Sequence, residues 1–399
     1  MGEQVKDKEA AKVGVEAQTF ICTNCGGIMK YDIGSQKFRC SACKAEGNIE
    51  ALSETVKEYD FSQYAEREKS SVAFEGVAVV HCQNCGCEIT FDEAQVATTC
   101  PMCASTQVAT VKQAGGIPPE GIVPFKVDKA QAAHKFKEWV KSRWFAPNDF
   151  KKKCGEGSLK GMYLPFWTYD STAISAYTGR GGTHRTEKDK EGNTKTVTDW
   201  TFVSGVVSKS FDDVQVCASE KEKNIAGILP FDTIQNTKPY AASYLSGFHA
   251  ELYTIKADKG FEKAKQIMEN DLRSLAESDI RRRYDVADVQ TLNTKHTDVT
   301  YKHVLLPIWG SAFGYNGKTY NYFVNGETGV VDGQRPYSVP KIVAAIIAAI
   351  VAIGILVVAF GGSETEAAEV HSPTVIAALG QERAAYSNDI EQIVFENNL

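Results

Sequence analysis

The most constraining feature of this sequence is a run of 22 uncharged residues between Lys341 and Glu364. Its central part, Ile342–Phe360, has no polar stripe on any helical face. A buried helix of a soluble domain normally keeps such a stripe. At ~1.5 Å per residue the run makes a helix of about 33 Å, which matches the ~30 Å hydrocarbon core of a bilayer. The run therefore predicts one transmembrane helix over residues 341–362. Alanines at every fourth position fit close helix pairing or plain alanine richness, so self-association stays open.

The charge balance indicates a direction for this span. Residues 1–362 hold 43 basic and 43 acidic residues, so the net charge of −6 comes from the residues that follow. Arg335 and Lys341 precede the span closely, whereas the next twenty residues hold only acids, and the N-terminal residues lack the apolar core of a secretory signal. We expect a single-pass protein of the cytoplasmic membrane, with its N-terminal bulk in the cytoplasm and a short tail on the other side.

Eight of the eleven cysteines form two copies of one pattern, CxxC, fourteen residues, CxxC. A CxxC turn presents two thiolates on one knuckle, and two knuckles at the ends of a short hairpin close a tetrahedral zinc site. The pattern predicts two zinc ribbons, at residues 19–48 and 79–110. The predicted ligands are Cys22, Cys25, Cys40 and Cys43 in the first ribbon and Cys82, Cys85, Cys100 and Cys103 in the second.

Four cysteine ligands leave no coordination position open, so both zinc sites are predicted to be structural, each contributing ~10–16 kcal/mol of apparent binding energy to folding. Gly26, Gly27 and Gly86 follow the first knuckles, where a tight turn favours positive φ. Redox CxxC pairs are the alternative, although many cysteines in a reducing compartment favour metal ligation over disulfides. Cys87 is either a substitute ligand for Cys85 or a spare thiol.

Four aliphatic-Pro-apolar steps mark a central domain that begins at a boundary signal, Ile117-Pro-Pro-Glu-Gly, and continues to residue 337. Residues 1–18 read as a flexible N-terminus and the polar residues 49–78 as a linker or short surface helix. The four steps are Ile122–Phe125, Leu164–Trp167, Leu229–Phe231 and Leu306–Trp309.

The segments after these steps alternate in type. After the first, Asp128 begins a helical pattern with Ala132, Phe136 and Val140 on one face, and after the third a longer pattern covers Phe261–Arg283. Strand-like segments follow the second and fourth steps. We therefore predict a multidomain α+β protein in which the central domain, 117–337, is duplicated into two related lobes that share one sheet system. In the helical pattern after the third step, the buried face is predicted to contain Ala264, Met268, Leu272 and Leu275. After the fourth step, Asn316-Gly317 predicts a hairpin turn. Gly179–Asp199, after the second step, is predicted to form a hairpin with a long polar loop.

No motif in the chain predicts catalysis. Residues Ala312–Thr319 approach the phosphate-binding GxxxxGK[ST] pattern, but a strand-like segment follows them, so the Asn-Gly hairpin explains them better and nucleotide binding is disfavoured. Neither HExxH nor GxSxG occurs. Cys154 and Cys217 have no neighbouring histidine motif and read as buried or idle thiols. We interpret four tryptophans as core or interface anchors: Trp144, Trp167, Trp200 and Trp309. An enzyme with a cleft between the two lobes remains a further hypothesis, besides the two binding functions considered below.

The charge of the ribbons disfavours nucleic acid. The first ribbon carries Lys30, Lys37, Arg39 and Lys44, whereas residues 82–103 contain three acids and no Lys or Arg. A pair of phosphate-tracking ribbons would be basic in both, so this pattern favours protein docking, with a membrane-tethered nucleic-acid binder as the alternative. Two basic clusters, Lys151–Lys153 and Arg281–Arg283, fit either anionic lipid headgroups or solvated surface. The acidic tail, 363–399, has apolar residues at helical spacing from Ile376 to Ile393 and reads as a short amphipathic helix or as a disordered segment.

The chain resembles a group of bacterial membrane-anchored double zinc-ribbon proteins, often labelled as transcription-factor-IIB-type zinc-ribbon proteins or as relatives of the primosomal helicase. Besides the ribbons, the resemblance is carried by Val123–Trp144, Tyr163–Trp167, Leu305–Trp309 and Tyr315–Gly329, and it covers nearly the whole chain up to Phe360. It implies a membrane adaptor that works with band-7/SPFH scaffold proteins and phage-shock-type membrane-stress proteins. No helicase motif accompanies the ribbons, so the leading hypothesis is a non-enzymatic adaptor that recruits protein partners.

Overall fold

The computed structural model describes residues 20–51, 53–70, 72–82, 88–92, 100, 108–153, 159–188, 190, 192–219 and 225–360. The chain divides into two compact units, Met1–Ser338 and Val339–Leu399. The predictions for residues 1–18 and 363–399, and those for Gly86, Cys85, Cys87, Cys103 and Cys154, lie outside the described residues.

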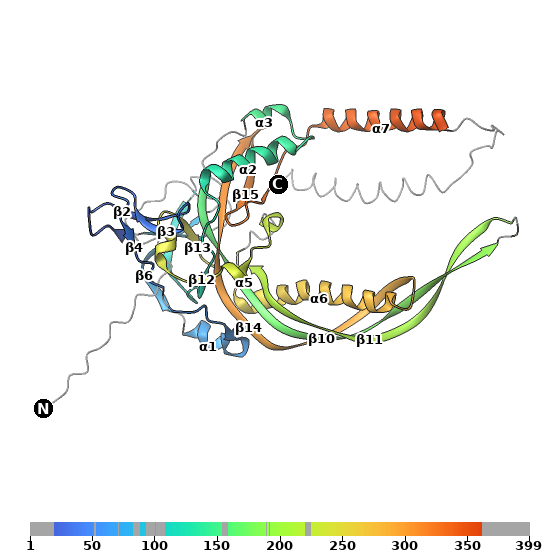
Figure 1. Cartoon of the computed structure of the whole chain (residues 1–399), viewed down its shortest axis with the longest axis horizontal. Helices are drawn as coiled ribbons and strands as arrows, with labels where there is room; N and C mark the ends of the chain where they lie inside the picture. Colours follow the sequence, from blue (N-terminus) through green and yellow to red (C-terminus); the bar gives the residue numbers. More distant parts are fainter. Residues whose placement is uncertain are drawn as a thin grey trace. The chain divides into compact units, whose positions relative to one another are not determined.

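A small four-stranded antiparallel sheet begins the described chain (Figure 1). The order in the sheet is β1-β2-β3-β4, and the core between the strands contains Met29 and Phe38. Two of the predicted metal ligands, Cys22 and Cys40, are buried beside them. This agrees with a small β module in the first predicted ribbon. The strands are β1 Phe20–Ile21, β2 Ile28–Asp32, β3 Lys37–Cys40 and β4 Glu46–Gly47.

A second sheet of twelve strands holds most of the larger unit. Its centre is three antiparallel strands of 29, 24 and 30 residues, β10 Lys160–Lys188, β11 Thr194–Cys217 and β14 Val286–Tyr315. At ~3.3 Å per residue, β10 is about 95 Å long, whereas most strands have about 5–6 residues. The other strands are β5 Tyr59–Asp60, β6 Val72–Cys82, β7 Glu88–Asp92, β8 Val108–Gly116, β9 Gly121–Ile122, β12 Lys238–Pro239, β13 His249–Glu251, β15 Lys318–Asn325 and β16 Val331–Gly333.

Helix α6, Ala257–Arg281, packs along one face of the long strands (Figure 1). Its buried stripe includes Ala264, Met268 and Leu272, as predicted, whereas Leu275 is 38% exposed and Ala276 takes the buried position. Gly260 lies against the aromatic side chains of β10, where an added Cβ would lie 2.3 Å from the Tyr169 hydroxyl oxygen. A side chain at residue 260 would therefore require Tyr169 or the helix to shift.

Helix α2, Lys129–Ser142, forms where the sequence predicts it. Asp128 and Gln131 make a capping box, which satisfies two backbone amides at the helix start. Ala132, Phe136 and Val140 are buried, and the Phe136 ring stacks on Tyr322 at 3.6 Å between centroids. The chain turns at residues 143–147 into α3, Asn148–Lys153. Two shorter helices complete this unit, α1 Tyr64–Lys69 and α5 Thr233–Asn236, together with 3-10 turns at Phe61–Gln63, Ala226–Ile228 and Ala242–Leu245.

Two of the proline steps are neighbours in the sheet, because Leu164 of β10 pairs with Leu306 of β14. Each step ends in a tryptophan whose indole N–H donates to a carbonyl just before a helix cap. Trp167 donates to Ile255 at 2.8 Å, one residue before the N-cap of α6, and Trp309 donates to Val127 at 2.9 Å, one residue before the N-cap of α2. Each tryptophan thus fixes the start of the helix on its side.

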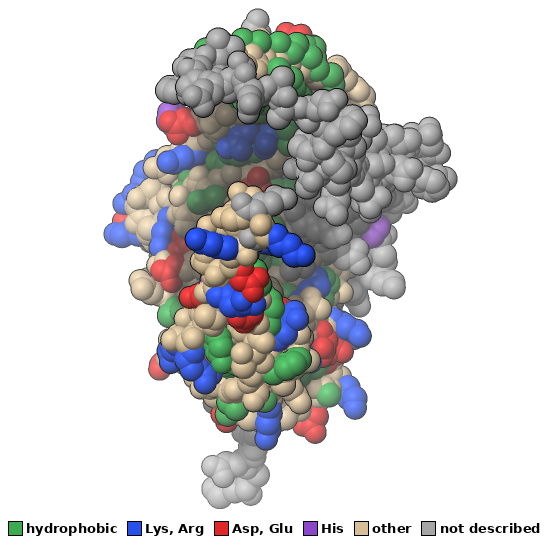
Figure 2. Space-filling model, turned by 90° about the vertical axis from the view of Figure 1, so that its right-hand side faces the viewer, with side chains coloured by type: hydrophobic (Ala, Val, Ile, Leu, Met, Phe, Trp, Pro, Cys, Tyr) green, Lys and Arg blue, Asp and Glu red, His purple; other side chains and the backbone are tan. Residues whose placement is uncertain are grey.

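The hairpin predicted within Gly179–Asp199 is confirmed, but the prediction that it carries a long polar loop is wrong. Strands β10 and β11 continue to Lys188 and Thr194, so only residues 189–193 connect them. Charged residues remain in strand conformation because they pair across the hairpin, as Arg185 does with Asp199 at 2.5 Å. Basic and acidic side chains mix on the face of the molecule shown in Figure 2. The Asn316-Gly317 turn is confirmed, since both residues have positive φ between β14 and β15.

Part of the stretch between the two cysteine patterns packs against the large sheet. Arg67 of α1 makes an ion pair of 2.6 Å with the buried carboxylate of Glu120. The rings of Phe61 and Tyr64 contact Tyr301 of β14 edge-to-face. These contacts attach residues 59–69 to the sheet.

The second unit contains helix α7, Val339–Phe360. Its first 18 residues have a mean hydropathy of 2.6, and none is buried. Among the described residues, this is the one helix long and apolar enough to cross a membrane.

Candidate metal centre

Four cysteines of the small sheet converge on one point. Cys22 and Cys25 flank the turn after β1, and Cys40 and Cys43 lie at the end of β3. The Sγ atoms of Cys22 and Cys43 are 3.7 Å apart, those of Cys25 and Cys40 are 3.5 Å apart, and all four lie within 4.8 Å of one another. A tetrahedral site with metal–sulfur bonds of ~2.3 Å has edges of about 3.8 Å. The cluster can therefore hold a metal ion, and its Sγ distances are too long for disulfides.

The two knuckles repeat the same turn. The Gly26 amide donates to the Cys22 carbonyl at 2.8 Å, and the Lys44 amide donates to the Cys40 carbonyl at 3.1 Å. Both donors have positive φ, 72° at Gly26 and 63° at Lys44. The expected positive φ is thus confirmed at Gly26. Gly27 serves a different purpose, because an added Cβ would lie 3.1 Å from the Cys40 sulfur and 3.3 Å from the Cys25 sulfur.

Hydrogen bonds prepare two of the thiols for ionisation. The Ala45 amide, followed by the Asn24 side chain, lowers the pKa of Cys43 to about 6. The Cys43 amide likewise lowers the pKa of Cys40. The Gly27 amide lowers the pKa of Cys25, but neighbouring thiols outweigh it and raise that pKa to about 11. Several thiolates at this spacing repel one another unless a cation lies between them. A bound metal ion supplies that positive charge.

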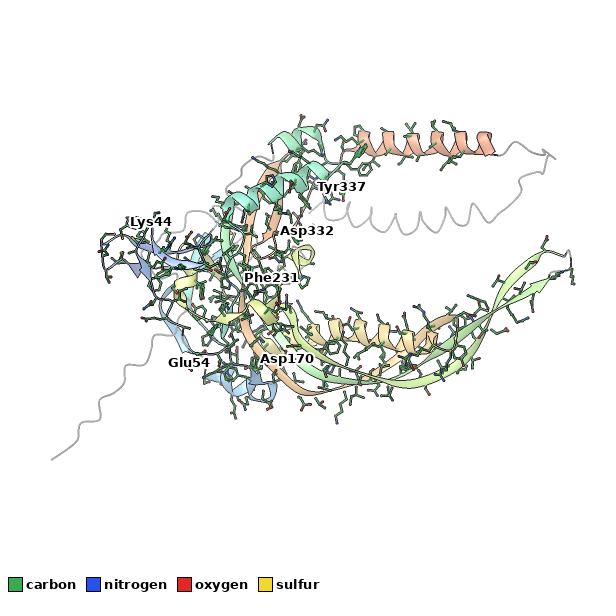
Figure 3. The ribbon with its side chains drawn as sticks, viewed as in Figure 1. Lys44, Glu54, Asp170, Phe231, Asp332 and Tyr337 are labelled. Carbon is green, nitrogen blue, oxygen red and sulfur yellow. The ribbon has the colours of Figure 1, made fainter. Side chains whose placement is uncertain are left out.

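The hairpin of the small sheet packs against the rest of the larger unit, to which it belongs. The Ser246 hydroxyl donates to the Met29 carbonyl at 2.7 Å, the Gln36 side-chain amide donates to the Phe125 carbonyl at 2.8 Å, and the Tyr31 ring contacts Tyr244. The knuckle residues Cys25 and Cys43 remain exposed. Figure 3 labels Lys44, which follows the second knuckle. The small sheet is therefore a fixed part of this unit, and its exposed end carries the candidate metal site.

Two of the basic side chains of the small sheet pair with its acids. Lys37 and Arg39 both pair with Glu46, at 2.8 Å and 2.7 Å, and Arg39 also approaches Asp32 at 3.8 Å. These pairs lower the pKa of Glu46, which remains ionised. Two of the four basic residues that the sequence offers for phosphate binding are thus engaged within the sheet itself.

The second cysteine pattern lies partly outside the described residues. Cys82 and Cys100 are both buried in one apolar cluster of the larger unit, whereas Cys85 and Cys103 are not described. Cys217, read from the sequence as a buried or idle thiol, is buried in the same cluster. The described residues thus bring together the four cysteines of the first pattern.

A second group of carboxylates had no signal in the sequence. Oxygens of Asp170, Asp212 and Asp213 lie within 4.8 Å of one another at a bulge of β10 and β11. The ammonium of Lys302 is 2.7 Å from Asp213 and 2.5 Å from Glu58, so a cation of the protein already occupies this position. Burial, together with Glu58, raises the pKa of Asp170 to about 6. The group is assembled from four separated segments, so no local spacing predicts it.

We expect Asp170→Asn to stabilise the protein at pH 7.5 by about 1 kcal/mol, after allowance for the partial exposure of this carboxyl. The raised pKa of Asp170 means that the wild type loses stability as pH rises from about 4 through 6, and Asn lacks that loss. Denaturant unfolding at pH 7.5 and at pH 4 measures the difference, which should shrink at the lower pH. A variant less stable than the wild type at pH 7.5 would show that loss of the second acceptor oxygen, which accepts from the Thr300 hydroxyl, outweighs the removal of the charge.

The fold and the cysteine cluster define a mixed α+β protein with a candidate metal centre in a small antiparallel sheet and one apolar C-terminal helix. Among curated proteins, the chain is 27% identical over 329 residues to an uncharacterised protein of Bacillus subtilis, YdjG. The matched region covers 82% of this chain and 92% of YdjG. No family model and no solved structure matches the chain.

Proposed function

We propose that this protein is a single-pass membrane-anchored zinc-ribbon adaptor. The carrying observation is the cluster of Cys22, Cys25, Cys40 and Cys43, a closed site whose knuckles are exposed while its hairpin is fixed to the larger unit. A closed site supports structure, not catalysis, because it leaves no position for water or substrate. Helix α7 follows the same unit in the chain and supplies the anchor.

Zinc is the metal that the donor set favours. Tetrahedral four-thiolate sites suit zinc or iron, and a redox-inactive ion fits a site that only orders a small sheet. We propose a second zinc site at Cys82, Cys85, Cys100 and Cys103 from the repeated spacing. The burial of Cys82 and Cys100 in one cluster supports it.

The two halves of the central domain are proposed to be related. The parallel roles of Trp167 and Trp309 support the duplication, because each indole fixes the start of one helix from the strand that carries the equivalent proline step. The direct antiparallel pairing of Leu164 with Leu306, which brings the two steps side by side, also supports this proposal.

The partner is proposed to be a protein at the cytoplasmic face of the membrane, and the resemblance favours an SPFH-type scaffold. The neutralised charge of Lys37 and Arg39 weighs against the alternative, a membrane-tethered nucleic-acid binder, because a phosphate-tracking surface needs those charges available.

We expect a tagged full-length protein, purified from crosslinked cells in detergent, to retain at least one protein partner. Cys22→Ser/Cys25→Ser should lose that partner by about tenfold or more, because the knuckles no longer hold the exposed surface in place. Quantitative mass spectrometry of the captured proteins measures the loss, with Cys154→Ser as a control that alters a cysteine outside both cysteine patterns. Equal capture by both cysteine variants would count against the adaptor proposal, and salt-sensitive capture of DNA or RNA would favour the alternative.

A further inference from the structure

The corner between α2 and α3 is tied to the last residue of the larger unit. The Ser338 amide donates to the Phe145 carbonyl at 2.8 Å. The next residue, Val339, begins α7, and consecutive Cα atoms are ~3.8 Å apart. Chain connectivity alone therefore keeps this corner within one residue of the start of the apolar helix, whatever direction the helix takes.

Both segments that meet at this corner are fixed to the sheet. The Gln334 amide donates to the Asn321 carbonyl of β15 at 2.8 Å. On the other side, the Phe150 ring of α3 contacts Tyr315 and Tyr320 edge-to-face. The Lys151 ammonium donates to the Lys141 carbonyl and links α3 to α2. The corner is therefore a rigid feature of the fold.

Two large aromatic side chains project from this corner. Trp144 is 78% exposed, and Tyr337 is 59% exposed (Figure 3 labels Tyr337). Neither side chain contributes much to the core, in contrast to Trp167 and Trp309. Exposed Trp and Tyr beside the end of an apolar helix are characteristic of the membrane–water interface, where an amphipathic ring lies at headgroup level.

The same corner is strongly basic. Residues 135–153, which form most of α2 and all of α3, contain seven Lys or Arg and two acids. The Arg143 guanidinium lies over the Trp139 ring, and that of Arg335 lies 5.3 Å from the centre of the Tyr337 ring. The other basic cluster differs, because Arg281 and Arg282 pair with acids of their own helix.

We propose that Trp144 and Tyr337, with Arg143 and Arg335, form a juxtamembrane rim that docks on the headgroups of an anionic phospholipid bilayer. The aromatic rings enter the interface, and the basic side chains lie among the lipid phosphates. The rim would hold the larger unit against the membrane instead of leaving it free on its anchor. This inference rests on the proposed anchoring by α7.

Fluorescence quenching of the full-length protein in vesicles tests the rim. The vesicles contain phosphatidylcholine alone or with about one-third phosphatidylglycerol, as anionic membranes do, and carry a nitroxide near the headgroup. We expect stronger quenching in the anionic vesicles and loss of that increment in Trp144→Phe, whereas Trp200→Phe, which alters an exposed residue of β11, retains it. Arg143→Gln/Arg335→Gln should weaken docking about fivefold per charge, and Arg281→Gln/Arg282→Gln is the charge-matched control.

The outcomes separate the rim from the anchor. Flotation of the protein with vesicles, combined with identical quenching in Trp144→Phe and the wild type, would overturn the rim and leave the anchor standing. Equal weakening by the two arginine pairs would also overturn it, because the effect would then follow net charge alone. Failure of the wild type to float would remove both the anchor and the rim.

Discussion

Cys22→Ser/Cys25→Ser should lower the zinc content of the purified protein by one equivalent and unfold the small sheet. Each structural zinc site contributes ~10–16 kcal/mol of apparent binding energy, which is more than a four-stranded sheet with a core of a few side chains can replace. The Tyr31 and Gln36 contacts with the larger unit should be lost together with the sheet. Elemental analysis measures the metal, and limited proteolysis within residues 20–49 measures the unfolding.

The matched control is Cys154→Ser, the same chemical change at a cysteine outside both cysteine patterns, which should retain all the zinc. Acid should imitate the double substitution. Zinc competes with protons for the four thiolates, so the zinc content is expected to fall as pH falls. An unchanged zinc content in the double variant would contradict the metal site.

Lys302→Met should destabilise the larger unit by about 3–5 kcal/mol at pH 7.5, because it leaves the buried carboxylate of Asp213 without its counter-charge. The Lys302 side chain is 8% exposed and that of its partner Asp213 is 2% exposed. Glu58 and Asp170 would then face Asp213 as like charges. Thermal unfolding in detergent should show a drop on the order of 10 °C.

The pH dependence of this loss has a definite sign. Lys302 lowers the pKa values of Glu58 and Asp170, so both rise when it is removed, and a raised pKa gives stability at low pH that is lost as pH increases. The deficit relative to the wild type should therefore be smaller at pH 5 than at pH 7.5. Lys302→Met/Asp213→Asn should recover part of the stability, whereas Lys195→Met, at an exposed site, should change it by less than about 0.5 kcal/mol. A deficit that does not change with pH would argue for lost packing instead of unpaired charge.

Elements defined by neighbours in sequence were predictable. The stripe of Ala132, Phe136 and Val140 and the turn at Asn316-Gly317 depend on contacts within a few residues, and both occur as expected. The polar residues of Gly179–Asp199 were misassigned to a loop because their strand conformation depends on a partner strand. The pair of Lys302 and Glu58 joins residues more than 240 positions apart, and no local pattern encodes it.

The four clustered cysteines and the apolar helix could be identified from the residues alone, since cysteine spacing sets the knuckles and an uncharged run needs no partner to be apolar. Their surroundings depend on contacts between distant segments. The tertiary structure docks the hairpin of the small sheet onto Phe125 and Ser246, and it holds the basic α2–α3 corner beside the residue that precedes α7. Next to the span in sequence there are two basic residues, Arg335 and Lys341. The fold brings the basic residues of the α2–α3 corner, almost two hundred residues earlier, to the same place. The physical reason is that strand register, which depends on long-range pairing, fixes which distant segments become neighbours.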